Sequence, residues 1–227
     1  MAASLGSSTD EPEPERFPTM VKVNGPAFSL SASGKLGGAI VFASWKGRPY
    51  ARQLVVPSNP KSAMQTSMRA MMKFLAQVWT SLSVAEKADW EIRAAQTSIS
   101  PFNAFVAYNQ YRWRSFLMPS QDDPATLAGT PSTISGWGAT AGIRQITLDW
   151  TVGTIADGWG FTIHRATAGT FTESLSNCIA VVACNSQAAF QYVDTPLVPA
   201  TYYYSYISFT EHGLKGTPSA EVTAAAS

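Results

Sequence analysis

Hydrophobic and polar residues alternate along the first part of the chain, as they do in β-strands. Between positions 20 and 57, two stretches rich in β-branched and aromatic residues, Gly38–Ser44 and Pro49–Val56, flank the short turn Trp45-Lys46-Gly47-Arg48. This spacing predicts a two-stranded β-ribbon. Proline has no N–H to give to a ladder, so we expect the strand of Pro49 at an edge or paired only further along the strand. A ribbon this small has little core of its own, and we expect it to lie against something else.

A period of three to four residues replaces the alternation between positions 58 and 118, which predicts a domain of three helices. The first helix opens at Asn59-Pro60, the second at the capping box of Ser83 and Glu86, and the third at Ser100-Pro101. The apolar stripe of the first helix consists of Met64, Met68, Met71, Leu75 and Val78. A methionine stripe can line an adaptable binding groove, but we favour the simpler interpretation, a small three-helix core.

Alternation with a period of two returns from position 126 to 227 and predicts an all-β sandwich. Ile146, Leu148 and Trp150 share one strand face, as do Trp159, Phe161 and Ile163 on the next strand. The intervening segment, residues 119–125, has the composition of a linker. The predicted fold class is therefore an α+β N-terminal region, a β-ribbon plus a three-helix core, followed by the sandwich.

The predicted strand Tyr202–Phe209 is apolar on both faces. Tyr202, Tyr204 and Tyr206 form one face, and Tyr203, Ile207 and Phe209 lie on the other. A strand face that meets water should carry polar residues instead. Two interpretations stay open: the C-terminal strand shields this region, or Tyr203, Ile207 and Phe209 form a surface that contacts a partner.

Charge is unevenly distributed along the chain. Charged residues make up 14% of the sequence, against about 25% in ordinary globular proteins, so partner subunits are expected to cover part of the surface. Every charged residue from Phe17 to Ala85 is positive, whereas the preceding segment carries Asp10, Glu11, Glu13 and Glu15. Residues 1–19 form an extended arm rich in acid and proline, a composition that does not order itself.

No catalytic constellation can be found in the sequence, and we expect neither enzymatic activity nor a cofactor. His164 lies in an apolar strand and His212 beside a turn, and neither has a metal-ligand neighbour at a suitable spacing, so no metal site is predicted. Cys178 and Cys184 could pair across a short loop or remain buried thiols. The chain has no recognisable secretory signal and no apolar run of ~18 residues, so we expect no membrane partner.

An ordered string of motifs runs between residues 34 and 118. It comprises Lys35-Leu36-Gly37-Gly38, Val41-Phe42, Trp45-Lys46-Gly47-Arg48-Pro49-Tyr50-Ala51-Arg52, Asn59-Pro60, Trp79-x-x-Leu82-Ser83-x-x-Glu86-Lys87-x-x-Trp90 and Pro101-Phe102-Asn103-x-Phe105. This string resembles a poorly characterised family of bacteriophage structural proteins and bacterial proteins of unknown function. The resemblance implies a structural role and brings no established chemistry.

A second resemblance covers residues 126–227. Trp150 in the second strand, the Leu-x-Pro-x-Thr-Tyr corner that ends at Tyr202, and Gly213 with Pro218-Ser219 before the last strand are similar to a fibronectin type III domain. The resemblance implies packing roles for Trp150 and Tyr202 and no activity, because the fold alone does not determine function.

Together these patterns favour a structural protein of a bacteriophage virion, made in the host cytoplasm and located in the capsid, neck or tail. Its partners would be other copies of itself and other virion proteins. The predicted assembly contacts are Trp45, Lys46, Arg48, Tyr50 and Arg52 of the ribbon. The alternative is an adhesion or carbohydrate-binding module on a particle or cell surface. A nucleic-acid-binding protein is also open but not favoured, because the basic residues are interleaved with apolar ones.

Overall fold

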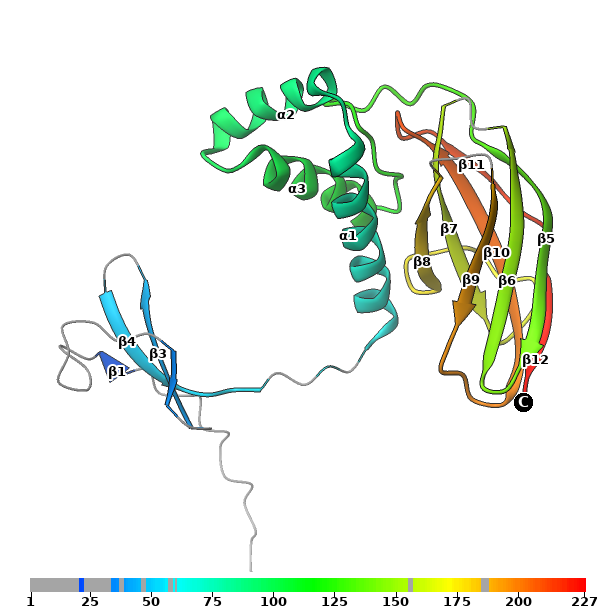
Figure 1. The fold of residues 1–227 in the computed structure, drawn as a ribbon, viewed down its shortest axis with the longest axis horizontal. Coiled ribbons are helices and arrows are strands. Elements are labelled where there is room, and N and C mark those ends of the chain that lie inside the picture. The colour runs from blue at the N-terminus through cyan, green and yellow to red at the C-terminus, as the bar shows by residue number, and fades with distance from the viewer. Residues whose placement is uncertain are drawn as a thin grey trace, which may run out of the picture. The chain divides into compact units, whose positions relative to one another are not determined.

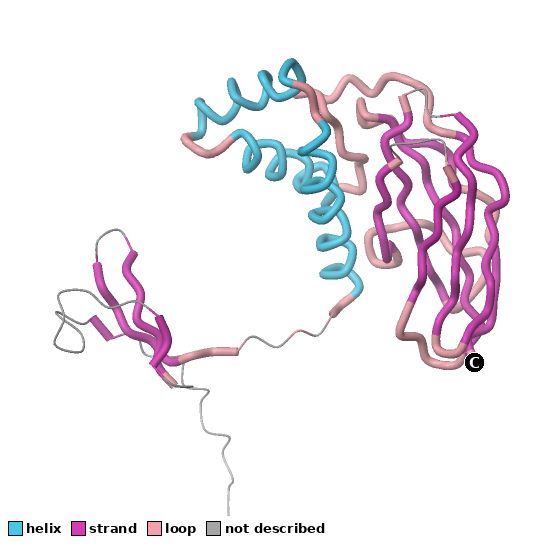
Figure 2. Tube along the Cα trace, in the orientation of Figure 1, coloured by secondary structure: helices cyan, strands magenta, loops and turns pink. Residues whose placement is uncertain are grey.

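The computed structural model of the protein describes residues 21–22, 34–36, 39–45, 48–56, 59, 61–154, 157–184 and 188–227. Figure 1 labels the elements, and Figure 2 shows the same trace by type of secondary structure. The chain divides into two units, residues 1–60 and residues 61–227. The predicted arm, residues 1–19, lies outside the described residues.

The first unit contains a four-stranded antiparallel sheet in the order β1-β4-β3-β2. Its strands are β1 (Val21–Lys22), β2 (Gly34–Leu36), β3 (Ile40–Trp45) and β4 (Arg48–Gln53). Strands β3 and β4 are the predicted ribbon, and the two short outer strands extend it. The edge-strand alternative for Pro49 is wrong, because β4 pairs with both β3 and β1, and β1 pairs with β4 only after Pro49. The missing N–H of Pro49 is tolerated because β1 pairs only with Tyr50 and Ala51.

The second unit begins with the three predicted helices: α1 (Ala63–Ser81), α2 (Val84–Thr97) and α3 (Pro101–Arg114). Helix α1 begins later than the Asn59-Pro60 signal predicts, because the Ser62 hydroxyl accepts a hydrogen bond from the amide of Gln65 and caps the helix there. The predicted capping box of Ser83 and Glu86 is confirmed. So is the start of α3 at Ser100-Pro101, with Ser100 as the cap.

The predicted methionine stripe of α1 is confirmed except at Met64: Met71, Leu75 and Val78 are buried, and Met68 packs against the same core. Ser67, Met71, Phe74, Leu75 and Val78 are buried. The side chain of Met64 is 47% exposed, so it lies outside the core. The buried face is wider than the predicted stripe because α1 packs against strand β8 as well as against α3, and Phe74 therefore takes part in the core.

Within the described part of residues 133–227, eight strands form the β-sandwich. They are β5 (Thr133–Gly142), β6 (Gln145–Thr154), β7 (Gly158–Ala166), β8 (Cys178–Ala183), β9 (Ala189–Asp194), β10 (Ala200–Thr210), β11 (Lys215–Pro218) and β12 (Val222–Ala226). One sheet has the order β5-β6-β9, and the other has the order β11-β10-β7-β8, with β12 also on β10. All these pairs are antiparallel. The predicted fold class, α+β with a fibronectin-like β-sandwich, is confirmed.

The sandwich core lies between the two sheets. Strand β6 contributes Ile146, Leu148 and Trp150, and all three are buried as the alternation predicts. Phe161 and Ile163 of β7 join this core, whereas Trp159 belongs to the cluster on the helical side. The pairing of β7 with β10 shifts register close to Trp159, so the simple alternation of β7 does not extend to this residue.

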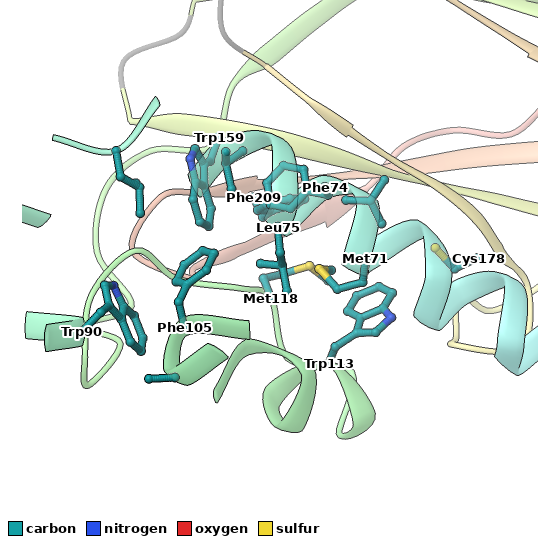
Figure 3. Close-up of a cluster of buried hydrophobic side chains, with 14 of the residues drawn as sticks. Met71, Phe74, Leu75, Trp90, Phe105, Trp113, Met118, Trp159, Cys178 and Phe209 are labelled. Carbon is teal, nitrogen blue, oxygen red and sulfur yellow. The ribbon is translucent and has the colours of Figure 1, made fainter. Parts of the chain in front are cut away.

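A second core lies between the helices and the outer face of the larger sheet (Figure 3). Phe74 of α1 meets Trp159 of β7 edge to face, with ring centroids 5.1 Å apart. Phe105 of α3 also meets Trp159, at 6.5 Å. Because side chains from α1, α3 and β7 share one cluster, the helices and the sandwich form a single packed unit.

Residues 119–125 are packed rather than free, in contrast to the predicted linker. Ser120 and Gln121 are buried. The carbonyl of Gln121 accepts a hydrogen bond from Nε1 of Trp90 at 2.8 Å. The carboxylate of Asp123 accepts two hydrogen bonds from Nη1 of Arg93, at 2.6 and 2.7 Å. This segment therefore holds the helices and the sandwich together.

Candidate functional site

The N-terminal sheet contains the predicted assembly contacts, and its pairing places them on one face. Lys35, Val41 and Arg52 lie opposite one another in a row across β2, β3 and β4. Ala43 lies opposite Tyr50 in the next row on the same face. Residues directly opposite in an antiparallel pair point to the same side. We call the set Lys35, Arg48, Tyr50 and Arg52 the basic face.

The cations of the basic face are accessible. Lys35, Arg48 and Arg52 are exposed, and Tyr50 is half-buried. Only the backbone of Trp45 is described, at the end of β3 opposite Arg48, and Lys46 lies outside the described residues. The structure therefore brings together three of the five predicted contacts, Arg48, Tyr50 and Arg52, and adds Lys35, which the sequence pattern did not place with them.

The opposite face of this sheet is apolar. Phe42 lies opposite Ala51, and both are half-buried, while Ile40 is 38% exposed. Among residues 34–56 whose side chains are described, none is buried. A sheet with one basic and one apolar face and no buried side chain in this range can bind a partner on either face.

The second predicted contact surface is wrong for two of its three residues. Ile207 and Phe209 are fully buried, and both belong to the core under the helices. Tyr203 stays partly exposed. Neither interpretation of the apolar pattern of β10 accounts for these two residues, because they pack in the core shared with α1 and α3 of the same chain.

Trp150 and Tyr202 occupy the interior of the sandwich. The Trp150 ring stacks on Phe190, with centroids 6.0 Å apart and planes 10° apart. The Tyr202 hydroxyl donates to the carbonyl of Val198 at 3.0 Å. A hydrogen bond back to the backbone a few residues upstream is the tyrosine corner of immunoglobulin-like sandwiches.

His164 is held in a buried hydrogen-bond network. Its Nδ1 lies 2.8 Å from Oδ1 of Asn177, and its Nε2 lies 2.9 Å from Oγ1 of Thr162. Burial lowers the pKa of His164, and the hydrogen bond that its ring donates to Oδ1 of Asn177 only partly opposes this. Because both ring nitrogens already have partners inside the protein, the arrangement serves packing between β7 and the loop before β8.

His212 lies between acidic side chains near the turn after β10. Its Nδ1 is 2.7 Å from Oδ2 of Asp122, and its Nε2 is 3.6 Å from Oε1 of Glu211. Partial burial by itself lowers the pKa of His212, but the hydrogen bond and charge of Asp122, with Glu211 and Asp157, outweigh it and raise the pKa. This ion pair ties residues 119–125 to the end of β10.

The two cysteines are free and buried. Burial raises the pKa of the Cys178 thiol to about 12. The pKa of Cys184 is raised by burial as well. Such thiols stay protonated at neutral pH and pack as small apolar groups.

A groove that the sequence did not predict lies along α1 and the edges of β8 and β9. It has a volume of about 420 Å³. Its lining residues are Thr66, Arg69, Ala70, Lys73, Gln77, Ile179, Ala180, Val181, Val182, Gln191 and Tyr192. These residues are up to 126 positions apart in sequence, from Thr66 to Tyr192, so a local sequence motif cannot predict the groove.

The described residues were also compared with the requirements of a metal site and of a membrane-spanning helix. Across these ranges, no three His, Cys, Asp or Glu side chains lie close enough together to hold a metal ion. None of the described helices has the length and apolar character needed to cross a bilayer.

No protein-family model matches the sequence, and no curated protein matches it either. Among solved structures, a β-1,2-glucanase from Parabacteroides distasonis matches with a TM-score of 0.31 and 20% identity over 44% of this chain and 14% of the glucanase. A Fn3-like protein from Clostridium thermocellum matches with a TM-score of 0.32 and 20% identity, over 44% of this chain and 96% of that protein.

The PKD domain of a peptidase from a Thermoplasmatales archaeon matches with a TM-score of 0.26 and 16% identity, over 44% of this chain and 97% of that domain. The fibronectin-like assignment rests on the strand order of the two sheets, since matches at these TM-scores are too remote to carry it.

Proposed function

We propose that the protein is a non-enzymatic structural component of a bacteriophage virion, a capsid decoration, neck or tail protein that docks through its N-terminal arm and sheet. The motif string between residues 34 and 118 supports the phage assignment. The surface of the N-terminal sheet supports docking. Other copies of the chain and other virion proteins are the partners.

The observation that carries the proposal is the N-terminal sheet with no buried side chain among those described at residues 34–56. Fixing the backbone of a residue costs about 1–2 kcal/mol, and buried apolar surface normally offsets this. The exposed positions of this sheet do not provide such burial. Contact with an assembled particle would bury Ile40, Phe42 and Ala51 and so stabilise the sheet.

The positive charge of the N-terminal sheet indicates the charge of the partner surface. The described charges of β2 and β4 are Lys35, Arg48 and Arg52, all of them positive and exposed. Opposite charge on the partner would orient the encounter and favour the correct neighbour. The partner surface for the basic face is therefore acidic.

The competing adhesion role loses its main support. That role would use C-terminal aromatic side chains, such as those of Tyr202–Phe209, for stacking on sugars. Tyr202, Tyr204 and Phe209 are buried instead, so these rings are not available to an external ligand.

The test is incorporation into particles. The full chain carrying R48E/R52E is supplied during assembly of the phage that encodes it, and the amount that co-purifies with particles is measured by quantitative mass spectrometry. We expect the wild type to be present at a fixed copy number and R48E/R52E to be lost from particles. The matched control is R114E/R144E, which makes the same charge change at two exposed arginines of the second unit.

Incorporation of R48E/R52E at the wild-type level would refute docking through the basic face. Absence of the wild-type chain from purified particles would refute the virion role. Binding of the wild type to short nucleic acid duplexes, with a steep loss of affinity in salt, would favour the nucleic-acid alternative.

A further inference from the structure

The groove beside β8 is long enough for an extended peptide. A second hollow of about 380 Å³ is lined by Gln77, Val78, Thr80, Ser81, Trp159, Val182, Ala183 and Cys184. Gln77 and Val182 line both hollows, so the two are neighbours along the same strand. The groove follows β8 from Ile179 to Cys184, with α1 as one wall. Figure 1 shows α1 and β8 next to each other.

Strand β8 is an edge strand of its sheet and, among the described strands, pairs only with β7. The amide of Cys184 donates to the carbonyl of Trp159 at 2.8 Å. Because backbone groups alternate in direction along a strand, Val181 and Ala183 turn their N–H and C=O groups away from β7. An edge of this kind is a template on which an extended peptide adds as a further strand.

The walls of the groove favour an acidic ligand. Arg69 and Lys73 of α1 are exposed and line it, and no acidic residue is among the lining residues. These two residues are four positions apart on the helix, a rise of about 6 Å. Tyr192 of β9 also lines the groove, and its aromatic ring can supply apolar surface there.

We propose that the segment Asp10–Glu15 of a neighbouring copy docks in this groove as an added strand on β8. The segment reads Asp-Glu-Pro-Glu-Pro-Glu, with proline at every second position. In an extended chain, the backbone groups of Glu11, Glu13 and Glu15 all turn to the same side. The backbone groups of Pro12 and Pro14 turn to the other side, away from β8. The added segment would be the new edge strand there, so no N–H donor is needed on that side.

Side chains of the segment alternate in the same way. The carboxylates of Glu11, Glu13 and Glu15 lie on one face at intervals of about 6.6 Å, close to the rise between Arg69 and Lys73. The rings of Pro12 and Pro14 lie on the other face, toward Tyr192. The backbone of the segment thus matches the edge of β8. Its carboxylates match the cations of α1, and its proline rings match the apolar surface of β9.

The assignment to a neighbouring copy rests on the proposed function, which places copies of the chain side by side on a particle. Under that proposal, the basic face of the N-terminal sheet meets an acidic particle surface. The groove accepts the acidic arm because it combines the edge strand β8 with the cations of Arg69 and Lys73.

The first experiment measures binding of a fluorescent peptide of residues 7–18, SSTDEPEPERFP, by anisotropy at low salt. The host is the full chain with D10N, E11Q, E13Q and E15Q, so that its own segment does not compete. We expect saturable binding that weakens with salt, and about tenfold lower affinity after R69E/K73E.

A peptide with lysine at positions 11, 13 and 15 should regain affinity for the R69E/K73E variant. N-methylation of Glu13, which removes one backbone donor, should abolish binding.

The matched control is R48E/R52E, which makes the same charge change on the basic face and should leave peptide binding unchanged. Failure of the peptide to bind would overturn the proposal. So would a loss of binding in R48E/R52E that equals the loss in R69E/K73E. These results are obtained without particles, so they are independent of the incorporation test of the proposed function.

The second experiment tests the neighbouring copy by sedimentation velocity. One chain carries R69E/K73E and keeps its acidic segment, while the other carries the four amide substitutions and keeps its groove. We expect each chain alone to sediment as a monomer and the mixture to form heterodimers. If the mixture stays monomeric while the peptide binds the amide host, the segment of one chain does not reach the groove of another, and the assignment to a neighbouring copy is overturned.

Discussion

The ring of Phe74 on helix α1 meets the ring of Phe209 on strand β10 edge to face, with 5.4 Å between the centroids and 74° between the planes. Both side chains are fully buried. Phe209 lies on the outer face of its sheet, so this pair joins the helices to the sandwich (Figure 3). The free energy of unfolding of each part therefore depends on the other.

Replacing Phe209 by alanine should destabilise the whole second unit. Truncating a buried phenylalanine costs about 3–5 kcal/mol. We expect helical circular dichroism and tryptophan fluorescence to report one common transition at a lower Tm. The control is V198A, since Val198 is 70% exposed and should change the free energy of unfolding by less than about 0.5 kcal/mol. Separate transitions of helices and sandwich would contradict the shared core.

A fragment of residues 126–227 should be less stable than one of residues 61–227. Without the helices, Ile207 and Phe209 meet water, and each buried side chain of this kind is worth about 1.5–3 kcal/mol. We expect the free energy of unfolding in urea to be lower by about 3–6 kcal/mol. Equal values for the two fragments would mean that the helices do not stabilise the sandwich.

Local patterns predicted the elements well and their partners poorly. The alternation of Ile146, Leu148 and Trp150 and the caps of α2 and α3 involve neighbours within a few residues, so the sequence alone identifies them. The pattern of β10 showed two apolar faces. It could not reveal that α1 covers Phe209, because that contact joins residues 135 positions apart, Phe74 and Phe209.

The same limit applies to the candidate sites. The β3–β4 hairpin was predicted because its strands are adjacent in sequence and its turn is short. Strands β1 and β2 have two and three residues, too few for a periodic signal. The basic face depends on register, which places Lys35 in a row with Val41 and Arg52. The groove needs α1, β8 and β9 together, which only the tertiary structure supplies.

The tyrosine corner gives a sharper test of the sandwich. Y202F removes the hydroxyl that donates to Val198 and leaves that carbonyl without this partner, at a cost of about 1–2 kcal/mol. The measurement is urea unfolding of the full chain. Y203F is the matched control, because Tyr203 is a partly exposed neighbour on the same strand. Equal effects of the two substitutions would show that the corner does not stabilise the fold.

The His212–Asp122 pair predicts a dependence of stability on pH. The pKa of His212 is raised in the folded protein above its ordinary value of 6.5, mainly because the hydrogen bond and charge of Asp122 outweigh partial burial. A raised pKa contributes stability fully below pH 6.5, and this contribution is lost as the pH rises through the folded-state pKa.

His164 acts in the opposite direction. Its pKa is lowered by burial, so its contribution is present above pH 6.5 and is lost as the pH falls through its folded-state pKa.

Comparing H212N with the wild type isolates the first effect, since His164 is present in both chains. We expect H212N to be less stable than the wild type at about pH 6, and the difference in free energy of unfolding to narrow by about pH 8.5. The charged groups that face His212 are Asp122, Glu211 and Asp157, and all three are present in both chains. D122N should remove most of the same pH dependence, because its amide keeps a hydrogen-bond acceptor without the charge. A difference between H212N and wild type that stays constant from pH 6 to 8.5 would mean that His212 stabilises the fold only as a neutral side chain.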